Sequence, residues 1–196
     1  ARSKTIARKK DEELLAIREA GLDRLHIGLE SGDDELLKKV KKGVDAQGHI
    51  QGGRKAVQAG FQVSEYWMPG LGGKEGWQSH ARETARVLSQ INPHYIRSRP
   101  FRPLPGSAMF EDYRQGSLQL LTPGEQLREL QETLWELDVT SRVCFDHAGN
   151  FWRGSKGGLL FSHDYEGYPF PESKAHVLTL IEDGLNFGQK RPSFVS

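Results

Sequence analysis

The chain has 196 residues, enough to bury the core of one ordinary domain or of one domain with an appendage. Its 27 Lys and Arg nearly balance its 26 Asp and Glu, and the formal net charge of +1 gives no indication of a nucleic-acid partner. No apolar run reaches the roughly 18 residues of a membrane span, so we expect a soluble protein. The single cysteine, Cys144, excludes a disulfide within the chain and any all-cysteine metal site, and is compatible with a reducing cytoplasm.

The first ten residues, ARSKTIARKK, are basic, but no apolar stretch and small-residue cleavage site follow them. This pattern does not predict a signal peptide. The chain also has no initiator Met, so we expect a part of a longer protein.

Helical and strand patterns alternate along the first hundred residues. Two helix-ending Ala-Gly pairs, Ala20-Gly21 and Ala59-Gly60, each lead directly into a strand, which is typical of repeated βα units with parallel strands. The expected elements are a helix over 11–20, a strand over 24–29, a short helix capped by Asp33 or Asp34, a helix over 45–59, a strand over 61–68, a helix over 79–90 and a strand over 94–99. We therefore predict that the strands near 24–29, 61–68 and 95–99 lie parallel and adjacent.

These strands carry polar residues on one face. In the first, Leu25, Ile27 and Leu29 alternate with small or polar residues, whereas Glu65 interrupts the apolar face of the second. A closed eight-stranded barrel fills its interior with aliphatic residues, and a doubly wound sheet is apolar on both faces. The pattern favours a partial or wide (β/α) barrel with a polar interior. The alternative is that Arg97 and Arg99 merely decorate a sheet edge.

The sequence changes character beyond residue 100. The proline-rich run over 100–113 has too little periodicity for a regular element and predicts an ordered loop. Thr122 to Glu125 form a capping box that opens an amphipathic helix, and a second amphipathic segment lies around 177–185. We divide the chain into a partial barrel over 1–113 and a helical and loop extension over 114–196 that packs on it.

Two segments resemble the ligand-holding segments of radical S-adenosylmethionine (radical SAM) enzymes. They are LHIGLESGDDELLKKVKKG over 25–43 and YWMPGLGGKE over 66–75. The resemblance implies the carboxyl-terminal part of a TIM-barrel-like radical SAM core. The CxxxCxxC loop, whose three cysteines bind the family's [4Fe-4S] cluster, is missing from the chain. We therefore expect that the chain by itself holds no metal, binds no cluster and does not cleave S-adenosylmethionine (SAM).

The resemblance implies cofactor contacts at the end of the first strand. Glu30, with Ser31 beside it, matches the family's acidic position, and a carboxylate can pair with the methionyl ammonium or accept hydrogen bonds from ribose hydroxyls. Lys42 matches a basic position suited to the methionyl carboxylate. The alternatives are a Glu that caps a helix or forms a salt bridge, and a Lys on a solvated basic face.

The second segment resembles the glycine-rich turn after the following strand. Gly70, Gly72 and Gly73 let backbone amides approach a ligand, here the adenine or ribose side of SAM. Gly72 replaces the proline of many relatives. Tyr66 and Met68, on the polar face of the strand, are candidates to pack on adenine.

Candidate substrate contacts come from three regions of the sequence. The runs NPHYIRSRPFRPLPG and FDHAGN resemble a subgroup of radical SAM proteins with an Ile-Arg-x-Arg strand, a Pro-Gly followed by a short helix, and a Ser-Asp-His-x-x-Asn motif whose Ser is Phe145 here. Histidine can move a proton near neutral pH. The candidates are His26, Arg97, Arg99, Asp146, His147 and Asn150. Alternatively, Asp146, His147 and Asn150 form a polar cluster that fixes the extension to the barrel.

The resemblance implies radical chemistry in the intact enzyme. A [4Fe-4S] cluster would cleave SAM reductively and the resulting radical would attack an unknown substrate. Two other classes stay open: a (β/α)-barrel enzyme with acid-base chemistry at Glu30, His26 and Arg99, and a non-catalytic SAM- or nucleotide-binding module. A CxxxCxxC loop upstream would exclude both. If the first strands are absent, the open barrel edge also allows self-association.

Overall fold

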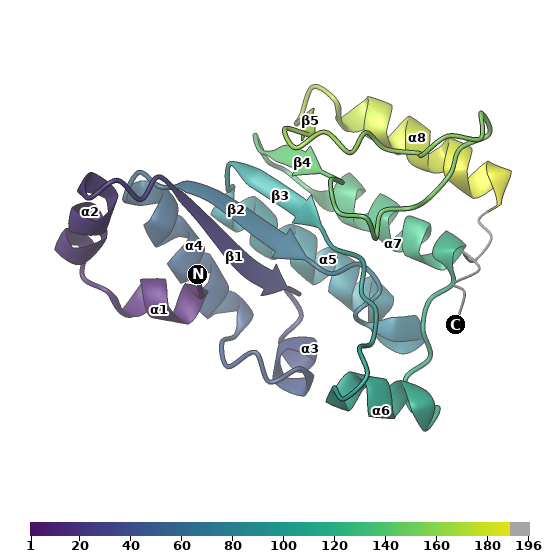
Figure 1. The fold of residues 1–196 in the computed structure, drawn as a ribbon, viewed down its shortest axis with the longest axis horizontal. Helices are drawn as coiled ribbons and strands as arrows, with labels where there is room; N and C mark the ends of the chain where they lie inside the picture. Colours follow the sequence, from purple (N-terminus) through teal and green to yellow (C-terminus); the bar gives the residue numbers. More distant parts are fainter. Residues whose placement is uncertain (189–196) are drawn as a thin grey trace.

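A single five-stranded sheet organises the chain. The computed structural model describes residues 1–188. Strands β1 (Arg24–Glu30), β2 (Gln62–Trp67), β3 (Tyr95–Ser98), β4 (Arg142–Cys144) and β5 (Tyr168–Pro169) follow one another in this order across the sheet (Figure 1). The first four are parallel and β5 is antiparallel to β4. The prediction of three parallel, adjacent strands is confirmed.

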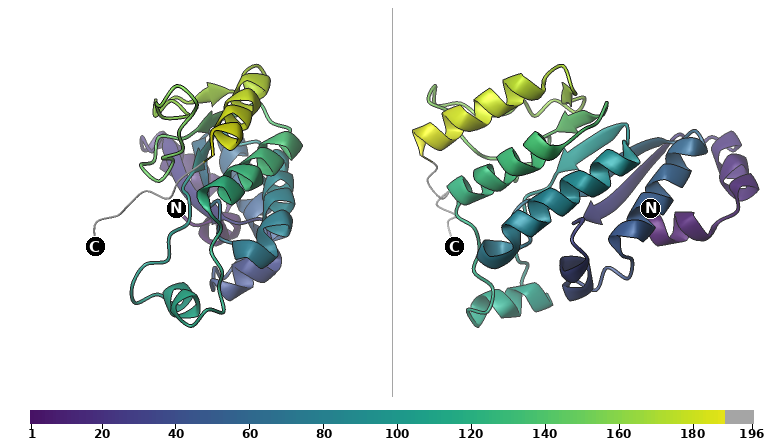
Figure 2. Two further views of the ribbon diagram at one scale, coloured as in Figure 1. Left: turned by 90° about the vertical axis from the view of Figure 1, so that its right-hand side faces the viewer. Right: turned by 180° about the vertical axis from the view of Figure 1, so that it is seen from behind.

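Helices cover one face of this sheet and leave the other face open. The helices are α1 (Ser3–Arg8), α2 (Asp11–Glu19), α3 (Asp34–Lys39), α4 (Ala46–Gln58), α5 (Gly73–Ile91), α6 (Ala108–Arg114), α7 (Pro123–Glu136) and α8 (Lys174–Phe187). In the two further views, α4, α5 and α7 lie side by side along the back of the sheet, with α8 beside α7 (Figure 2). The described strands thus form an open arc, as expected for part of a (β/α) barrel.

The core lies between the sheet and these helices. Leu25, Ile27 and Leu29 point to the helical side and are buried, as the alternation predicted. Burial of one such side chain contributes about 1.5–3 kcal/mol, so this face determines which side of each strand the helices cover. The main cluster joins the sheet to α5, α7 and α8, and includes Trp67, Ile96, Leu127, Val143, Trp152 and Val177.

Local capping signals define the element ends. Gly21 and Gly60 have φ of +100° and +81°, which end their helices at low steric cost. Of the two candidate caps, Asp33 accepts the Leu36 N–H at 3.0 Å, whereas Asp34 accepts that of Ala46 at 2.7 Å. The capping box at the start of α7 is also formed.

Three features differ from the sequence prediction. The run expected to be an ordered loop contains α6, because Ser107 caps this short helix and Met109 anchors it by burial. The short helix agrees with the subgroup resemblance. Helix α5 begins at Gly73, well before the predicted residue 79, since the glycine loop runs directly into it. Beyond residue 113 the chain adds β4 to the same sheet as well as packing helices on it.

Candidate cofactor and substrate site

The side of the sheet without helices, called the open face below, gathers polar side chains from four strands. The parallel register places one residue of each strand beside the next: His26, Ser64, Tyr95 and Arg142 form one row, and Gly28, Tyr66, Arg97 and Cys144 the next. Partners in register on parallel strands point to the same face. The alternative that Arg97 decorates a sheet edge is wrong, because β3 lies between β2 and β4 and Arg97 is 1% exposed.

A charge pair lies over the end of β1. Glu30 Oε1 and Lys42 Nζ are 3.0 Å apart, and both side chains are about one quarter exposed. Gly28 makes room for this pair, since a Cβ there would lie 2.2 Å from Glu30 Oε1 and 3.1 Å from Lys42 Nζ. Glu30 has φ of +67°, a left-handed conformation that non-glycine residues adopt infrequently. The two predicted cofactor contacts are therefore together, accessible and of opposite charge.

Ser31 is used differently from its neighbour Glu30. Its side chain is fully buried, and its Oγ is 2.8 Å from His80 Nδ1 and accepts the Asp33 N–H at 2.9 Å. The adjoining Gly32 N–H donates to Thr84 at 3.0 Å. The turn after β1 is thus fixed to helix α5 from behind the site.

The glycine loop after β2 is fixed by a buried carboxyl group. Glu129 of α7 is fully buried; its Oε2 accepts the Gly70 N–H at 2.7 Å and its Oε1 is 3.3 Å from His80 Nε2. His80 Nε2 is also 3.1 Å from the Met68 carbonyl oxygen, which identifies Nε2 as the protonated nitrogen. Burial raises the pKa of Glu129 to about 8 and lowers that of His80 to about 4. Both groups are therefore largely neutral at pH 7.

The predicted glycines take the conformations that the loop requires. Gly70 and Gly73 have φ of +90° and +60°, and a Cβ at Gly72 would lie 2.7 Å from the Gly76 carbonyl carbon. Met68 links this loop to β1, because its N–H donates to the Glu30 carbonyl at 3.0 Å. The two segments proposed to hold SAM are thus connected through backbone as well as side chains.

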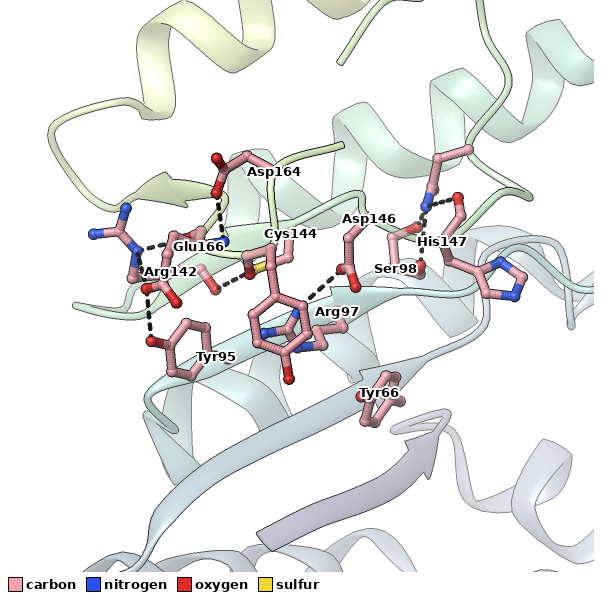
Figure 3. A network of polar contacts seen from close by, with 12 residues as sticks. Tyr66, Tyr95, Arg97, Ser98, Arg142, Cys144, Asp146, His147, Asp164 and Glu166 are labelled. Carbon is pink, nitrogen blue, oxygen red and sulfur yellow. Dashed lines mark hydrogen bonds and ion pairs between the residues drawn. The ribbon is translucent and has the colours of Figure 1, made fainter. Parts of the chain in front are cut away.

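The remaining predicted residues surround Arg97 and Arg99. Arg97 Nη1 is 2.9 Å from Asp146 Oδ1, and the two side chains point toward each other in Figure 3. The guanidinium carbon of Arg97 is 3.8 Å from the centre of the Tyr165 ring. The guanidinium of Arg99 is 4.3 Å from the centre of the Tyr66 ring. These contacts bring β2, β3 and the segment after β4 together on the open face.

The three histidine and asparagine candidates have distinct environments. His26 Nδ1 is 2.8 Å from the Tyr66 hydroxyl, and burial followed by the charge of Arg97 lowers the pKa of His26. Burial followed by the charge of Arg99 lowers the pKa of His147. Asn150 is fully buried and clamps Ser98 through both its amide oxygen and its amide nitrogen. In this arrangement Asn150 holds the segment after β4 to β3.

Several site residues were missed by the sequence reasoning. His80 and Glu129 carry no local signal for their roles, because they lie in amphipathic helices where a polar residue is ordinary. Tyr95 and Tyr165, which lie 5.0 and 3.8 Å from the Arg97 guanidinium, come from parts of the chain far apart in sequence. For Tyr95 a signal existed, since it shares the strand with Arg97.

The chain provides no visible metal site within its described part. Residues 1–188 hold no group of three or more His, Cys, Asp or Glu side chains placed to bind a metal ion. Burial raises the pKa of the Cys144 thiol to about 12, so it is not a thiolate near neutral pH. A three-cysteine cluster does not fit this chain. Over the same range, no helix has both the length and the apolar character needed to cross a bilayer.

Comparison with known proteins agrees with this geometry. Residues 3–80, which include β1, β2 and the glycine loop, match the family model described as the Radical SAM superfamily. The likeness to this superfamily therefore lies in the barrel part of the chain. Comparison with curated protein sequences finds no match.

Three solved structures share the fold. A TM-score of 0.61 relates the chain to the archaeal Elp3 of Methanocaldococcus infernus, at 17% identity over 93% of this chain and 40% of that one. The methylornithine synthase PylB has a TM-score of 0.53 to this chain, at 19% identity over 90% of this chain and 42% of PylB. Coproporphyrinogen III oxidase (HemN) of Escherichia coli, described as a radical SAM enzyme, has a TM-score of 0.51 at 21% identity. The match covers 65% of this chain and 29% of HemN. The chain spans at most about two fifths of these proteins.

Proposed function

We propose that the chain is the SAM-holding, carboxyl-terminal part of the barrel of a radical SAM enzyme. The observation that carries this proposal is the Glu30–Lys42 pair, 3.0 Å apart over Gly28 at the carboxyl end of β1. In (β/α) barrels this end of the strands holds the chemistry. The superfamily match over 3–80 supports the same assignment.

The residues present fit the two charged ends of SAM. The cofactor carries an ammonium group and a carboxylate on its methionyl part, and a bound zwitterion can replace the Glu30–Lys42 contact with one charge-assisted contact to each residue. Glycine at position 28 provides the space, whereas the Gly70, Leu71 and Gly73 N–H groups of the neighbouring loop already donate within the chain, to Glu129, Met68 and Gly70. When bound with a reduced cluster, SAM supplies the radical that starts the reaction.

The chain's own residues would bind and orient SAM and shield it from water. Glu30 is assigned to the ammonium or ribose hydroxyls, Lys42 to the methionyl carboxylate, and Tyr66 and Met68 to the adenine side. Ser31 helps indirectly, because its hydroxyl fixes the turn that carries Glu30. The [4Fe-4S] cluster requires cysteines outside this chain, so the whole reaction belongs to the intact protein.

Calorimetric titration of SAM into the intact protein tests the proposal. Each charge-assisted contact contributes about 1.5–3 kcal/mol, so Glu30→Ala and Lys42→Ala should each weaken SAM binding roughly tenfold or more. Lys38→Ala is the matched control, since Lys38 lies in α3, four residues before Lys42, and is exposed. Thermal unfolding should be nearly unchanged in all three. If both site variants bind SAM like the control, the pair has a structural role and the proposed cofactor site is wrong.

A further inference from the structure

The guanidinium of Arg97 has an unused hydrogen-bonding edge although it is buried. Its Nη1 forms an ion pair with Asp146, Nε and Nη2 have neither an ion-pair nor a hydrogen-bond partner among the described residues, and the side chain is 1% exposed. Nε and Nη2 form the side edge of the guanidinium, whose two parallel N–H bonds match the two oxygens of a carboxylate. Buried donors without acceptors are uncommon in native proteins and require an explanation.

Aromatic rings hold this edge in place. The centres of the Tyr165 and Tyr95 rings lie 3.8 and 5.0 Å from the guanidinium carbon of Arg97. Neither ring contact takes a hydrogen bond from Nε or Nη2, which stay available to a ligand. Tyr165 is itself 45% exposed, so movement of its ring gives access from solvent.

A second unpartnered polar group points to the same face. Ser64 Oγ is fully buried and has no hydrogen-bond partner in the described structure. Ser64 is in register with Tyr95, in the row before that of Tyr66 and Arg97 on the open face. A hydroxyl that can donate and a guanidinium edge that only donates are together suited to an oxyanion.

We propose that the open face beside β2 and β3 binds a carboxylate of the substrate through the Nε–Nη2 edge of Arg97. This inference rests on the proposed function and adds the substrate class to it. Arg97 pairs with Asp146, and Arg99, directly after the same strand, and Arg24 of β1, which lies beside the Tyr95 and Tyr165 rings, supply further positive charge. The edge offers two in-plane N–H donors, which satisfy the two oxygens of a carboxylate but leave the further oxygens of a phosphate monoester without partners.

Acetate is the probe for a test with the chain itself. At equal ionic strength, sodium acetate but not sodium chloride should raise the thermal unfolding midpoint, with a dissociation constant on the order of millimolar for so small a ligand. Arg97→Lys keeps the charge but loses the bidentate edge, and should weaken acetate binding tenfold or more. Arg142→Lys is the matched control, because the Nε of Arg142 is already bonded to the Glu166 carbonyl. Inorganic phosphate should stabilise less than acetate.

Nuclear magnetic resonance of the unaltered chain tests the same proposal, even if the Arg97→Lys variant does not fold. The Nε–H resonance of Arg97 in the unaltered chain should shift on addition of acetate, whereas that of Arg142 should not. The proposal is overturned if acetate leaves the Arg97 resonance unchanged, or if the effect survives Arg97→Lys. It is also overturned if the effect is lost in Lys42→Ala but kept in Arg97→Lys, which would assign acetate to the proposed methionyl site. SAM affinity is measured separately, so failure here leaves the cofactor proposal standing.

Discussion

Replacement of Glu129 by Gln should change how the stability of the chain depends on pH. Glu129 is fully buried, and burial raises the pKa of its carboxyl group from 4.5 to about 8. Between these values the unfolded chain carries a carboxylate at this position and the folded chain a protonated acid. The folded state then binds more protons, so the free energy of unfolding must fall as the pH rises.

The size of the effect follows from this interval. One pH unit corresponds to about 1.4 kcal/mol, so the 3.5 units between 4.5 and about 8 give a loss of about 5 kcal/mol on going from below pH 4.5 to above pH 8. Gln does not titrate. The Gln side chain also turns its NH₂ group toward either the Gly70 N–H or the His80 Nε2–H. This contact between two donors lowers the free energy of unfolding by the same amount at every pH, so it does not change the slope of that free energy against pH.

Urea unfolding of the chain at pH 5, 6, 7 and 8, followed by circular dichroism, measures the slope. Relative to Glu129→Gln, the unaltered chain should lose roughly 1 kcal/mol or more per pH unit over this range. Glu136→Gln, an exposed change near the end of the same helix, is the control and should have the slope of the unaltered chain. Equal slopes for all three proteins would refute the reasoning, because Glu129 would then be ionised in the folded state throughout.

Two further substitutions separate binding from stability. Gly28→Ala should weaken SAM binding to the intact protein severalfold in calorimetry, with little loss of thermal stability. The reason is that the new Cβ displaces only the flexible ends of the Glu30 and Lys42 side chains. Unaltered affinity would show that these ends do not contact the cofactor. Glu65→Leu should stabilise the chain at pH 7 by about 1–3 kcal/mol in urea unfolding. The Glu65 carboxyl group is fully buried without a hydrogen-bond partner in the described structure, and burial raises its pKa well above 4.5. Destabilisation would indicate a role for the acid in packing.

Much of the barrel part could be predicted because its signals are local. The alternation of Leu25, Ile27 and Leu29 identifies a strand and its buried face within a few residues. The glycines at 21 and 60 mark helix ends by their own conformational freedom. Repetition of these units then implies parallel strands without any long-range information.

The parts that were missed depend on contacts between distant residues. Strand β4 has three residues, too few for a period-two pattern, and it exists because β3 offers it backbone partners. Glu129 lies 59 residues from Gly70, and nothing in its own helix indicates that it would meet a loop amide. The stacking of Tyr165 on Arg97 likewise requires the fold to bring two segments together. Such contacts are products of the tertiary structure.

The conformation of Glu30 connects the fold to the proposed chemistry. A non-glycine residue with φ of +67° costs stability that glycine at the same position would largely avoid. The strain is maintained from behind, since the Met68 N–H holds the Glu30 carbonyl oxygen and the next residues are tied to His80 and Thr84. These buried partners are uncharged or nearly so, whereas the charges of Glu30 and Lys42 face solvent over Gly28. A carboxylate held in a strained position by its surroundings, and left about one quarter exposed, supports the proposed ligand contact over a purely structural role.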